Sequence, residues 1–467
     1  MPRSRPERTL VPLRNMPSHR LAWLAAWLAA LPLETLARPE VELCGGEPMP
    51  APEAPYTVRC AVDFGIVGNR TDVTQPLSEA VTALQQEKAR LFLPAGAYGI
   101  REGLTLPAGT GLIGSPTGKT RLTNHIEPSL LSADTGRLFL DGSPASTHST
   151  LIQDLHLENV AVVVSSQAHA VIRHNLFRGF RSRVTQLHLD GTGQRVVEDN
   201  VFWREPSADG GAGIELFVEP GATGLGRTTI RRNLIGAVDP DRLRPGQAES
   251  ARQLARQAMG TQAPASLGHY ASAIQLLGAG NTRVEGNVIA SRAPTPAGRS
   301  HPLRSHPLAH FVMAESLALV ANAFQGGPGR AVVLSAMSGV EVRDNTFVKA
   351  ALRIKSFNGR PTKRVVVQDN WLRGQGIVVD VAVNGAGEDH TTPDDVRIAD
   401  NLVTRAAKAG TAQACGYRLR QPLVGTKNFT VEPGRGLTVE KAAIESGPGP
   451  TRRTIKLGGT LTSVCTR

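Results

Sequence analysis

Aromatic residues, cysteines and long apolar runs are all scarce in this chain of 467 residues. Only 4% of the residues are aromatic, which leaves few side chains on which bases could stack, so we do not expect a nucleic acid partner. The longest apolar run, residues 21–31, ends at Pro32 and spans about half of a bilayer core. A stable membrane span is therefore not expected.

The same apolar run predicts export. Five arginines precede it, and the small residues Thr35 and Ala37 follow it at the spacing typical of a cleavage point. We predict a signal peptide over residues 1–37 and a periplasmic or secreted mature protein. The arginines are Arg3, Arg5, Arg8, Arg14 and Arg20.

The four cysteines agree with an oxidising compartment. Cys44 and Cys60 are close in sequence, as are Cys415 and Cys465. Two such disulfides would tie down the two ends of a domain, with residues 38–60 forming a short segment before it. Free buried thiols are the alternative, and sequence spacing leaves the pairing open. The spacings do not predict a metal site.

One sequence pattern recurs through most of the chain: an alternating apolar run, an Asn, and a second apolar pair. The intervals between the asparagines are 25, 33, 54, 35, 23, 25 and 31 residues. A unit of 23 to 25 residues, enlarged by loops and skipped once, explains all of them. The asparagines are Asn175, Asn200, Asn233, Asn287, Asn322, Asn345, Asn370 and Asn401.

Each unit predicts a strand, a corner at Asn and a second short strand. No unit can bury its own apolar face, so stacking must supply the core, and the repeat predicts a β-solenoid. We expect each Asn to take the left-handed backbone conformation at its corner. We also expect its amide to bond to the Asn one coil away, forming a ladder.

The segment AVDFGIVGNRTDVTQPLSEAVTAL and the later FLPAGAY resemble the entry of right-handed parallel β-helix proteins of the pectate lyase superfamily. That superfamily includes polygalacturonases, polysaccharide lyases, uronan epimerases and phage tailspikes. The resemblance implies a single right-handed parallel β-helix over residues 61–420, with a β cap over 421–467. It also implies a first strand at 62–65, an amphipathic helix at 71–84 and a strand with a Pro-Ala-Gly turn at 92–98. Residues 68–72 read Gly-Asn-Arg-Thr-Asp and lack the family's acidic cluster there.

Leu352-Arg353-Ile354-Lys355 is similar to the Arg-Ile-Lys motif of polygalacturonases, whose cations hold a substrate carboxylate. Strand alternation puts Arg353 and Lys355 on one side and Ile354 inward. Two cations side by side predict a carboxylate clamp, and a solvated basic face is the alternative. Further substrate-binding candidates near the clamp are Lys349, Lys363 and Arg364.

The longer loops hold the remaining candidates. Asp239-Pro240-Asp241-Arg242 is faintly similar to the Asp-Pro-His-Asp motif of mannuronan epimerases, so Asp239 and Asp241 are substrate-binding candidates. An Asp-Pro turn leading to a helix at 249–259 is the alternative. Gly268-His269-Tyr270 supplies half of the Gly-His-Gly motif of polygalacturonases, which makes His269 a candidate base.

A loop rich in histidine has the wrong spacing for a metal site. His301, His306 and His310 are separated by Pro and Arg and lack the regular spacing that would converge ligands, so we expect a solvated loop. We predict no protein metal site, and leave open whether Ca²⁺ serves as a cofactor.

Charge favours an anionic partner. The formal net charge is 52 − 40 = +12, and an exported basic protein is suited to an anionic polysaccharide. We predict a monomeric enzyme that acts on a uronate-containing polysaccharide by β-elimination. In that mechanism Arg353 and Lys355 stabilise the enolate formed from the carboxylate, while His269 or a neighbouring cation acts as base.

Three alternatives remain open from the sequence. Hydrolysis needs two carboxyl groups across the scissile bond, and the loops offer several aspartates for it. A uronan epimerase of the same fold is the second alternative. A non-catalytic glycan-binding or envelope-assembly protein is the third. The aspartates are Asp239, Asp241, Asp380, Asp389, Asp394 and Asp395.

Overall fold

The structure is a computed structural model, and it describes most residues between 42 and 404. The chain divides into two compact units, Met1–Leu43 and Cys44–Arg467, and nearly all of the first, with the predicted signal peptide, lies outside the described residues. None of the described helices is both long and apolar enough to cross a membrane. The described residues are 42–124, 136–142, 146–179, 184–204, 212–218, 226–236, 239–259, 272–278, 280–290, 307–327, 330–357, 359–374, 377–380 and 393–404, with short strands at 417–420, 430–431, 439–440, 456–457 and 464–465.

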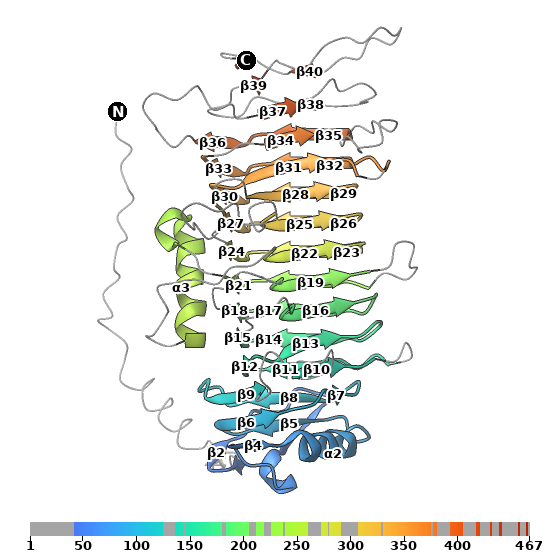
Figure 1. The fold of residues 1–467 in the computed structure, drawn as a ribbon, viewed down its shortest axis with the longest axis vertical. Helices are drawn as coiled ribbons and strands as arrows, with labels where there is room; N and C mark the ends of the chain where they lie inside the picture. Colours follow the sequence, from blue (N-terminus) through green and yellow to red (C-terminus); the bar gives the residue numbers. More distant parts are fainter. Residues whose placement is uncertain are drawn as a thin grey trace, which may run out of the picture. The chain divides into compact units, whose positions relative to one another are not determined.

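The second unit is a stack of coils, and successive coils add strands to three parallel sheets (Figure 1). Within the described residues the sheets hold 14, 12 and 13 strands, and they are called sheets 1, 2 and 3 in the order in which a coil visits them. This confirms the predicted right-handed parallel β-helix.

Sheet 1 contains β3 (Thr57–Cys60), β5 (Ala89–Leu93), β8 (Gly111–Gly114), β11 (Thr150–Gln153), β14 (Ala170–Arg173), β17 (Arg195–Glu198), β20 (Thr228–Arg231), β23 (Gly280–Glu285), β26 (Glu315–Val320), β29 (Ser338–Arg343), β32 (Lys363–Gln368), β35 (Asp394–Ala399), β38 (Thr430–Val431) and β40 (Lys456–Leu457). Sheet 2 contains β4 (Asn69–Asp72), β6 (Gly96–Ile100), β9 (Thr120–Asn124), β12 (His156–Glu158), β15 (Leu176–Arg178), β18 (Val201–Phe202), β21 (Leu234–Ile235), β24 (Val288–Ala290), β27 (Ala323–Gln325), β30 (Thr346–Val348), β33 (Trp371–Arg373) and β36 (Leu402–Thr404). Sheet 3 contains β7 (Leu104–Leu106), β10 (Arg137–Leu140), β13 (Ala161–Val164), β16 (Leu187–Asp190), β19 (Ile214–Phe217), β22 (Ile274–Leu277), β25 (Ala309–Val312), β28 (Ala331–Ser335), β31 (Ala351–Lys355), β34 (Ile377–Asp380), β37 (Tyr417–Arg420), β39 (Val439–Glu440) and β41 (Val464–Cys465).

The core runs through the middle of the stack. Inward Val, Ile, Leu and Phe side chains of successive coils lie over one another in one continuous buried cluster. Phe177 and Phe202, paired in register on β15 and β18, stack with ring centroids 4.4 Å apart. Because each coil covers the apolar face of the next, burial along the whole stack supplies the stability that no coil has alone.

The predicted Asn ladder is present. Each Asn side chain is buried, and the Nδ2 of each one before Asn401 donates to the Oδ1 of the next Asn, as in the 2.9 Å bond from Asn233 to Asn287. The same Oδ1 accepts the backbone N–H of the previous Asn, also at 2.9 Å for this pair. The ladder connects all eight predicted asparagines, from Asn175 to Asn401.

The predicted left-handed conformation belongs to a different residue. The residue just before each ladder Asn has the positive φ, for example 57° at His174, 55° at Asp199 and 53° at Arg232. The prediction that Asn itself adopts this conformation is therefore wrong. The Asn turns its amide into the buried corner, where it satisfies backbone groups that the turn leaves without partners.

The amino-terminal end of the second unit is closed by a disulfide and a helix. Cys44 and Cys60 form the predicted bond, with their Cα atoms 5.4 Å apart. The first strand of sheet 1 is β3, whereas the predicted strand at 62–65 is a 3-10 helix, η1 (Ala61–Phe64), that ends at Gly65 with φ 72°. The predicted amphipathic helix is α2 (Thr74–Leu84), and its buried face covers the first coils. β1 (Leu43–Cys44) and β2 (Glu47–Pro48) form a separate two-stranded sheet and precede β3 in the sequence.

A second helix lies on the outside of sheet 2. After η3 (Pro240–Arg242), α3 (Pro245–Met259) packs Ala248, Ala251 and Leu254 against outward residues of sheet 2, and Leu243 just before the helix joins the same cluster (Figure 1). The prediction of a helix at 249–259 is confirmed, although the helix begins four residues earlier, because 249 − 245 = 4.

The carboxy-terminal strands continue the parallel pairing. β38 pairs with β35, and β39 pairs with β37. The predicted division at residues 420 and 421 stays a prediction. Cys415 lies outside the described residues, so its bond to Cys465 also stays a prediction.

Candidate functional site

The outward face of sheet 3 carries a line of side chains that are all polar except Val333, which is 6% exposed. One outward position recurs in register on six consecutive strands, and apolar neighbours on either side of it point into the core. Strands lie about 4.8 Å apart, so the line forms a continuous track along the stack. Its residues are His188, Glu215, Gln275, His310, Val333 and Arg353.

The first part of this track holds an acid–base pair. His188 Nδ1 lies 3.3 Å from Glu215 Oε2, and the Thr185 hydroxyl donates to the same oxygen at 3.0 Å. Both ionisable side chains are about one third exposed, at 32% and 31%. The hydrogen bond from His188 lowers the pKa of Glu215, with further help from Thr185, and outweighs the opposite effect of burial. Glu215 is therefore an ionised carboxylate within reach of solvent.

A second carboxyl group lies beside this pair. Asp190 follows His188 by two residues on β16, so its side chain projects from the same face. Asp190 is in register with Phe217, two residues beyond Glu215 on β19. This diagonal offset places the Cα atoms of Asp190 and Glu215 roughly 8 Å apart.

A buried arginine fixes the end of β16. The Arg195 guanidinium is fully enclosed and donates to the carbonyl oxygens of Asp190, Gly191 and Ser165, at 2.9 Å for Gly191 and 3.3 Å for Ser165. Burial lowers the pKa of Arg195 to about 10. Because three carbonyls share one rigid donor, the backbone that carries Asp190 is held in place.

The predicted clamp lies farther along the same face. Ile354 is buried while Arg353 and Lys355 are half-buried and point outward, as strand alternation predicts. Lys355 Nζ lies 5.9 Å from the centroid of the Phe357 ring. Four strand steps separate β31 from Glu215 on β19, which is roughly 19 Å.

The other predicted cations belong to different surfaces. Lys349 is at the turn between β30 and β31, with φ 51°. Lys363 and Arg364 begin β32 in sheet 1, where Arg364 donates to the Ser338 hydroxyl at 2.8 Å. The structure therefore does not bring these cations onto the outward face of sheet 3.

The predicted aspartates of the Asp-Pro motif hold a turn together. Asp239 pairs with Arg242 at 2.7 Å, and its backbone N–H donates to Gln325. Asp241 pairs with Arg252 of α3 at 3.2 Å. This matches the alternative reading of a turn that leads into a helix, and it places both aspartates over sheet 2.

Several predicted residues cannot be placed. His269, His301, His306 and Asp389 lie outside the described residues, and the side chains of Asp380 and Asp394 are not described. His310 is on β25, within the polar track. Within the described part of the chain, no three His, Cys, Asp or Glu side chains converge as a metal site would require.

Sequence reasoning missed Asp190, Glu215 and their neighbours, although a signal for them exists. Several members of the track precede a ladder Asn by a constant distance: 200 − 188, 287 − 275, 322 − 310 and 345 − 333 all equal 12. Glu215 breaks the rule, since 233 − 215 is 18. Counting back from each Asn therefore finds most of the track, and unequal loops hide the rest.

Comparisons with known proteins found a family model and several similar solved structures. Residues 58–237 match the family model described as rhamnogalacturonase A/epimerase, pectate lyase-like. No curated protein matches the chain. Similar solved structures include PfbA, a surface adhesin of Streptococcus pneumoniae, with 14% identity over 75% of this chain and 90% of that one, at a TM-score of 0.44. The DFA-IIIase of Arthrobacter chlorophenolicus A6 is 13% identical over 80% and 93%, also at 0.44.

A phage protein has a similar sequence identity and TM-score. The tailspike gp49 of Acinetobacter baumannii bacteriophage Fri1, a capsular polysaccharide depolymerase, is 10% identical over 83% of this chain and 60% of that one, at a TM-score of 0.43. Residues 58–237 thus match a pectate lyase-like family model, and the described strands from β3 onward form a right-handed parallel β-helix.

Proposed function

We propose that this protein is an exported glycoside hydrolase that cleaves a uronate-containing polysaccharide laid along the outward face of sheet 3. One observation carries the proposal: Asp190, His188 and Glu215 lie together on adjacent strands of the same face that presents Arg353 and Lys355. A long flat face suits an extended glycan, because successive sugar units can contact successive strands.

Hydrolysis fits the acid–base pair. Glycosidases use two carboxyl groups roughly 5 to 9.5 Å apart, one as proton donor and one as base or nucleophile. Glu215, with its lowered pKa, is the base or nucleophile. Asp190 is the proton donor on the neighbouring strand. His188 keeps Glu215 ionised and fixes its orientation.

The clamp has a separate role in this proposal. A guanidinium binds a carboxylate through two parallel hydrogen bonds, which Arg353 can supply, and Lys355 adds a second positive charge. At roughly 19 Å from Glu215 the clamp holds a sugar several units away from the scissile bond. Strand register therefore favours hydrolysis over the β-elimination that the sequence suggested, since elimination needs the cation at the reacting sugar.

Substrate class and compartment rest on further features. The net charge of +12 favours an anionic polymer, and the apolar leader with the Cys44–Cys60 bond favours an extracytoplasmic location. We propose a secreted or periplasmic monomer.

Product analysis tests the proposed reaction. Purified protein is incubated with pectate, alginate and glycosaminoglycans, with and without a chelator, and both reducing ends and ultraviolet absorbance are followed. Hydrolysis predicts new reducing ends without added absorbance. Reducing ends that rise together with absorbance would mean elimination, and the absence of any product from all these polymers would contradict a cleaving enzyme.

Replacing the clamp arginine is expected to weaken substrate binding. Arg353→Ala removes a charged hydrogen-bond donor, so we expect KM to rise about 10-fold or more with kcat little changed. Steady-state kinetics on the polymer found above measure both constants. Arg364→Ala removes an exposed arginine of sheet 1 and serves as the matched control. An equal rise in KM for both variants would show that only overall charge matters.

A further inference from the structure

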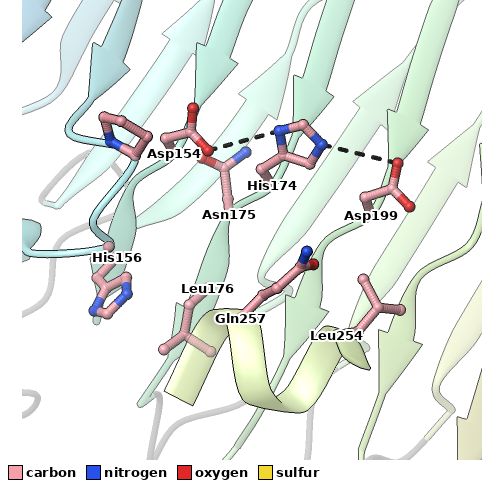
Figure 2. A pocket seen from close by; sticks show the side chains of 10 residues that line it. Asp154, His156, His174, Asn175, Leu176, Asp199, Leu254 and Gln257 are labelled. Carbon is pink, nitrogen blue, oxygen red and sulfur yellow. Dashed lines mark ion pairs between the residues drawn. The ribbon is translucent and has the colours of Figure 1, made fainter. Parts of the chain in front are cut away.

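A second candidate site lies beneath the carboxy-terminal end of α3, away from sheet 3. A cavity of about 270 Å³ is bordered there by Leu254 and Gln257 of α3, His156 of β12 and the turn at Gly118 (Figure 2). Its other wall is the corner where sheet 1 passes into sheet 2. The volume suits a ligand of about one sugar ring, because sites for larger drug-sized ligands begin near 300 Å³.

Three titratable side chains form a row on the corner wall. Asp154, His174 and Asp199 come from successive coils and all occupy the left-handed corner position, with φ 55°, 57° and 55°. His174 lies between the two carboxylates, with Nδ1 3.6 Å from Asp154 Oδ1 and Nε2 3.9 Å from Asp199 Oδ2 (Figure 2). Because successive coils stack at a regular spacing, side chains at the same corner position form a row of polar groups.

The two carboxylates have different surroundings. Asp199 accepts two hydrogen bonds from Arg232, at 2.9 and 2.7 Å, so its charge is balanced. Asp154 accepts a 2.7 Å bond from the neutral Gln153 amide, and its ion-pair partner within the described structure is His174. Burial raises the pKa of Asp154 despite Gln153, His174 and Arg173. Asp154 is thus a largely buried carboxylate, with 18% of its side chain exposed, whose positive neighbours offset the effect of burial only in part.

The helix end on the opposite wall also favours a cation. The last carbonyl groups of a helix lack intrahelical partners, and the helix end carries a partial negative charge. Gly118 has φ 70°, which favours glycine, and its turn lies close to both walls, since a Cβ there would be 3.9 Å from the Gln257 carbonyl oxygen and 3.4 Å from His156 Nε2. Burial, together with Arg121 and Arg178, lowers the pKa of His156 and keeps its imidazole neutral.

We propose that this cavity binds an amino sugar. The protonated amine lies between Asp154 and the end of α3, while Gln257 and the neutral His156 bond to hydroxyl groups. Leu176 and Leu254 supply apolar contact for the ring. An uncharged sugar supplies no positive charge beside Asp154, and the carboxylate of a uronate would be repelled by Asp154 and Asp199. The proposal is independent of the cleavage assigned to sheet 3.

Calorimetric titration of the full chain with three monosaccharides tests this site. Glucosamine is expected to bind at pH 7, whereas N-acetylglucosamine and glucuronate are expected to bind at least 10-fold more weakly, because each lacks the free amine. Asp154→Asn keeps the side-chain shape and suits a left-handed backbone, so it is expected to fold and to weaken glucosamine binding about 10-fold or more.

The matched control is Asp369→Asn, since Asp369 has φ 56° at the same corner position outside the cavity. It is expected to leave binding unchanged. The proposal is overturned if glucosamine gives no heat of binding up to its solubility limit, or if the acetylated sugar binds as tightly. It is also overturned if Asp369→Asn weakens binding as much as Asp154→Asn does.

Discussion

Asn287→Ala is expected to lower the free energy of unfolding by about 3–5 kcal/mol. The Asn287 side chain takes part in five hydrogen bonds inside the ladder, two from Asn233 and three to Ile230, Glu285 and Asn322. The substitution leaves the buried N–H of Asn233 without this acceptor, and an unsatisfied buried donor costs about 1–3 kcal/mol by itself. Urea denaturation followed by circular dichroism measures the change.

The position within the ladder provides a graded comparison. Asn175, the first member, takes part in three side-chain bonds and receives only the Leu155 N–H at its oxygen, so Asn175→Ala is expected to cost less. Gln368→Ala on the outward face of sheet 1 is the control and is expected to change little. If Asn287→Ala proved no more harmful than Gln368→Ala, the ladder would not be a source of stability.

Glu215→Gln is expected to lower kcat by about 10²–10⁴-fold while the protein stays folded. The amide keeps the size of the side chain and its contact with Thr185, but it cannot act as a base or nucleophile. Asp190→Asn is expected to have a similar effect, since it removes the proton donor. Initial rates on the polymer identified by product analysis measure both losses.

A carboxylate on another sheet controls for surface charge. Glu341 lies on sheet 1 and pairs with Arg343 at 2.9 Å, so Glu341→Gln is expected to keep full activity. The pH profile adds a further check. Because the pKa of Glu215 lies below the ordinary value of 4.5, the ionised base persists as pH falls, and the acidic loss of activity is expected below pH 4.5. Full activity of Glu215→Gln would remove this residue from the chemistry.

The sequence predicts the stack well because every coil repeats the same physical requirement. A corner that buries polar backbone groups needs an amide side chain to satisfy them, so the asparagines recur and can be counted. The segment at 62–65 shows the limit of alternation as a signal. Val62 and Phe64 are 39% and 36% exposed, so these apolar residues do not mark a buried strand face, and the backbone forms η1 instead.

The sequence also predicts some residues of the candidate site and misses others. Arg353 and Lys355 could be placed because alternation within one strand fixes which side chains share a face. Asp190 and Glu215 could not, because their proximity depends on the register between strands of successive coils, and the coils differ in length. The left-handed conformation was likewise assigned to the wrong residue of the corner. The Asn must direct its amide into the core, so the residue before it takes the positive φ.

The account rests on a glycan lying along sheet 3, and a crystal structure of the Glu215→Gln variant with an acidic oligosaccharide tests it most directly. We predict electron density for the oligosaccharide on the outward face between His188 and Lys355, with a carboxylate against Arg353. Density on sheet 1, or only in the cavity beneath α3, would contradict it.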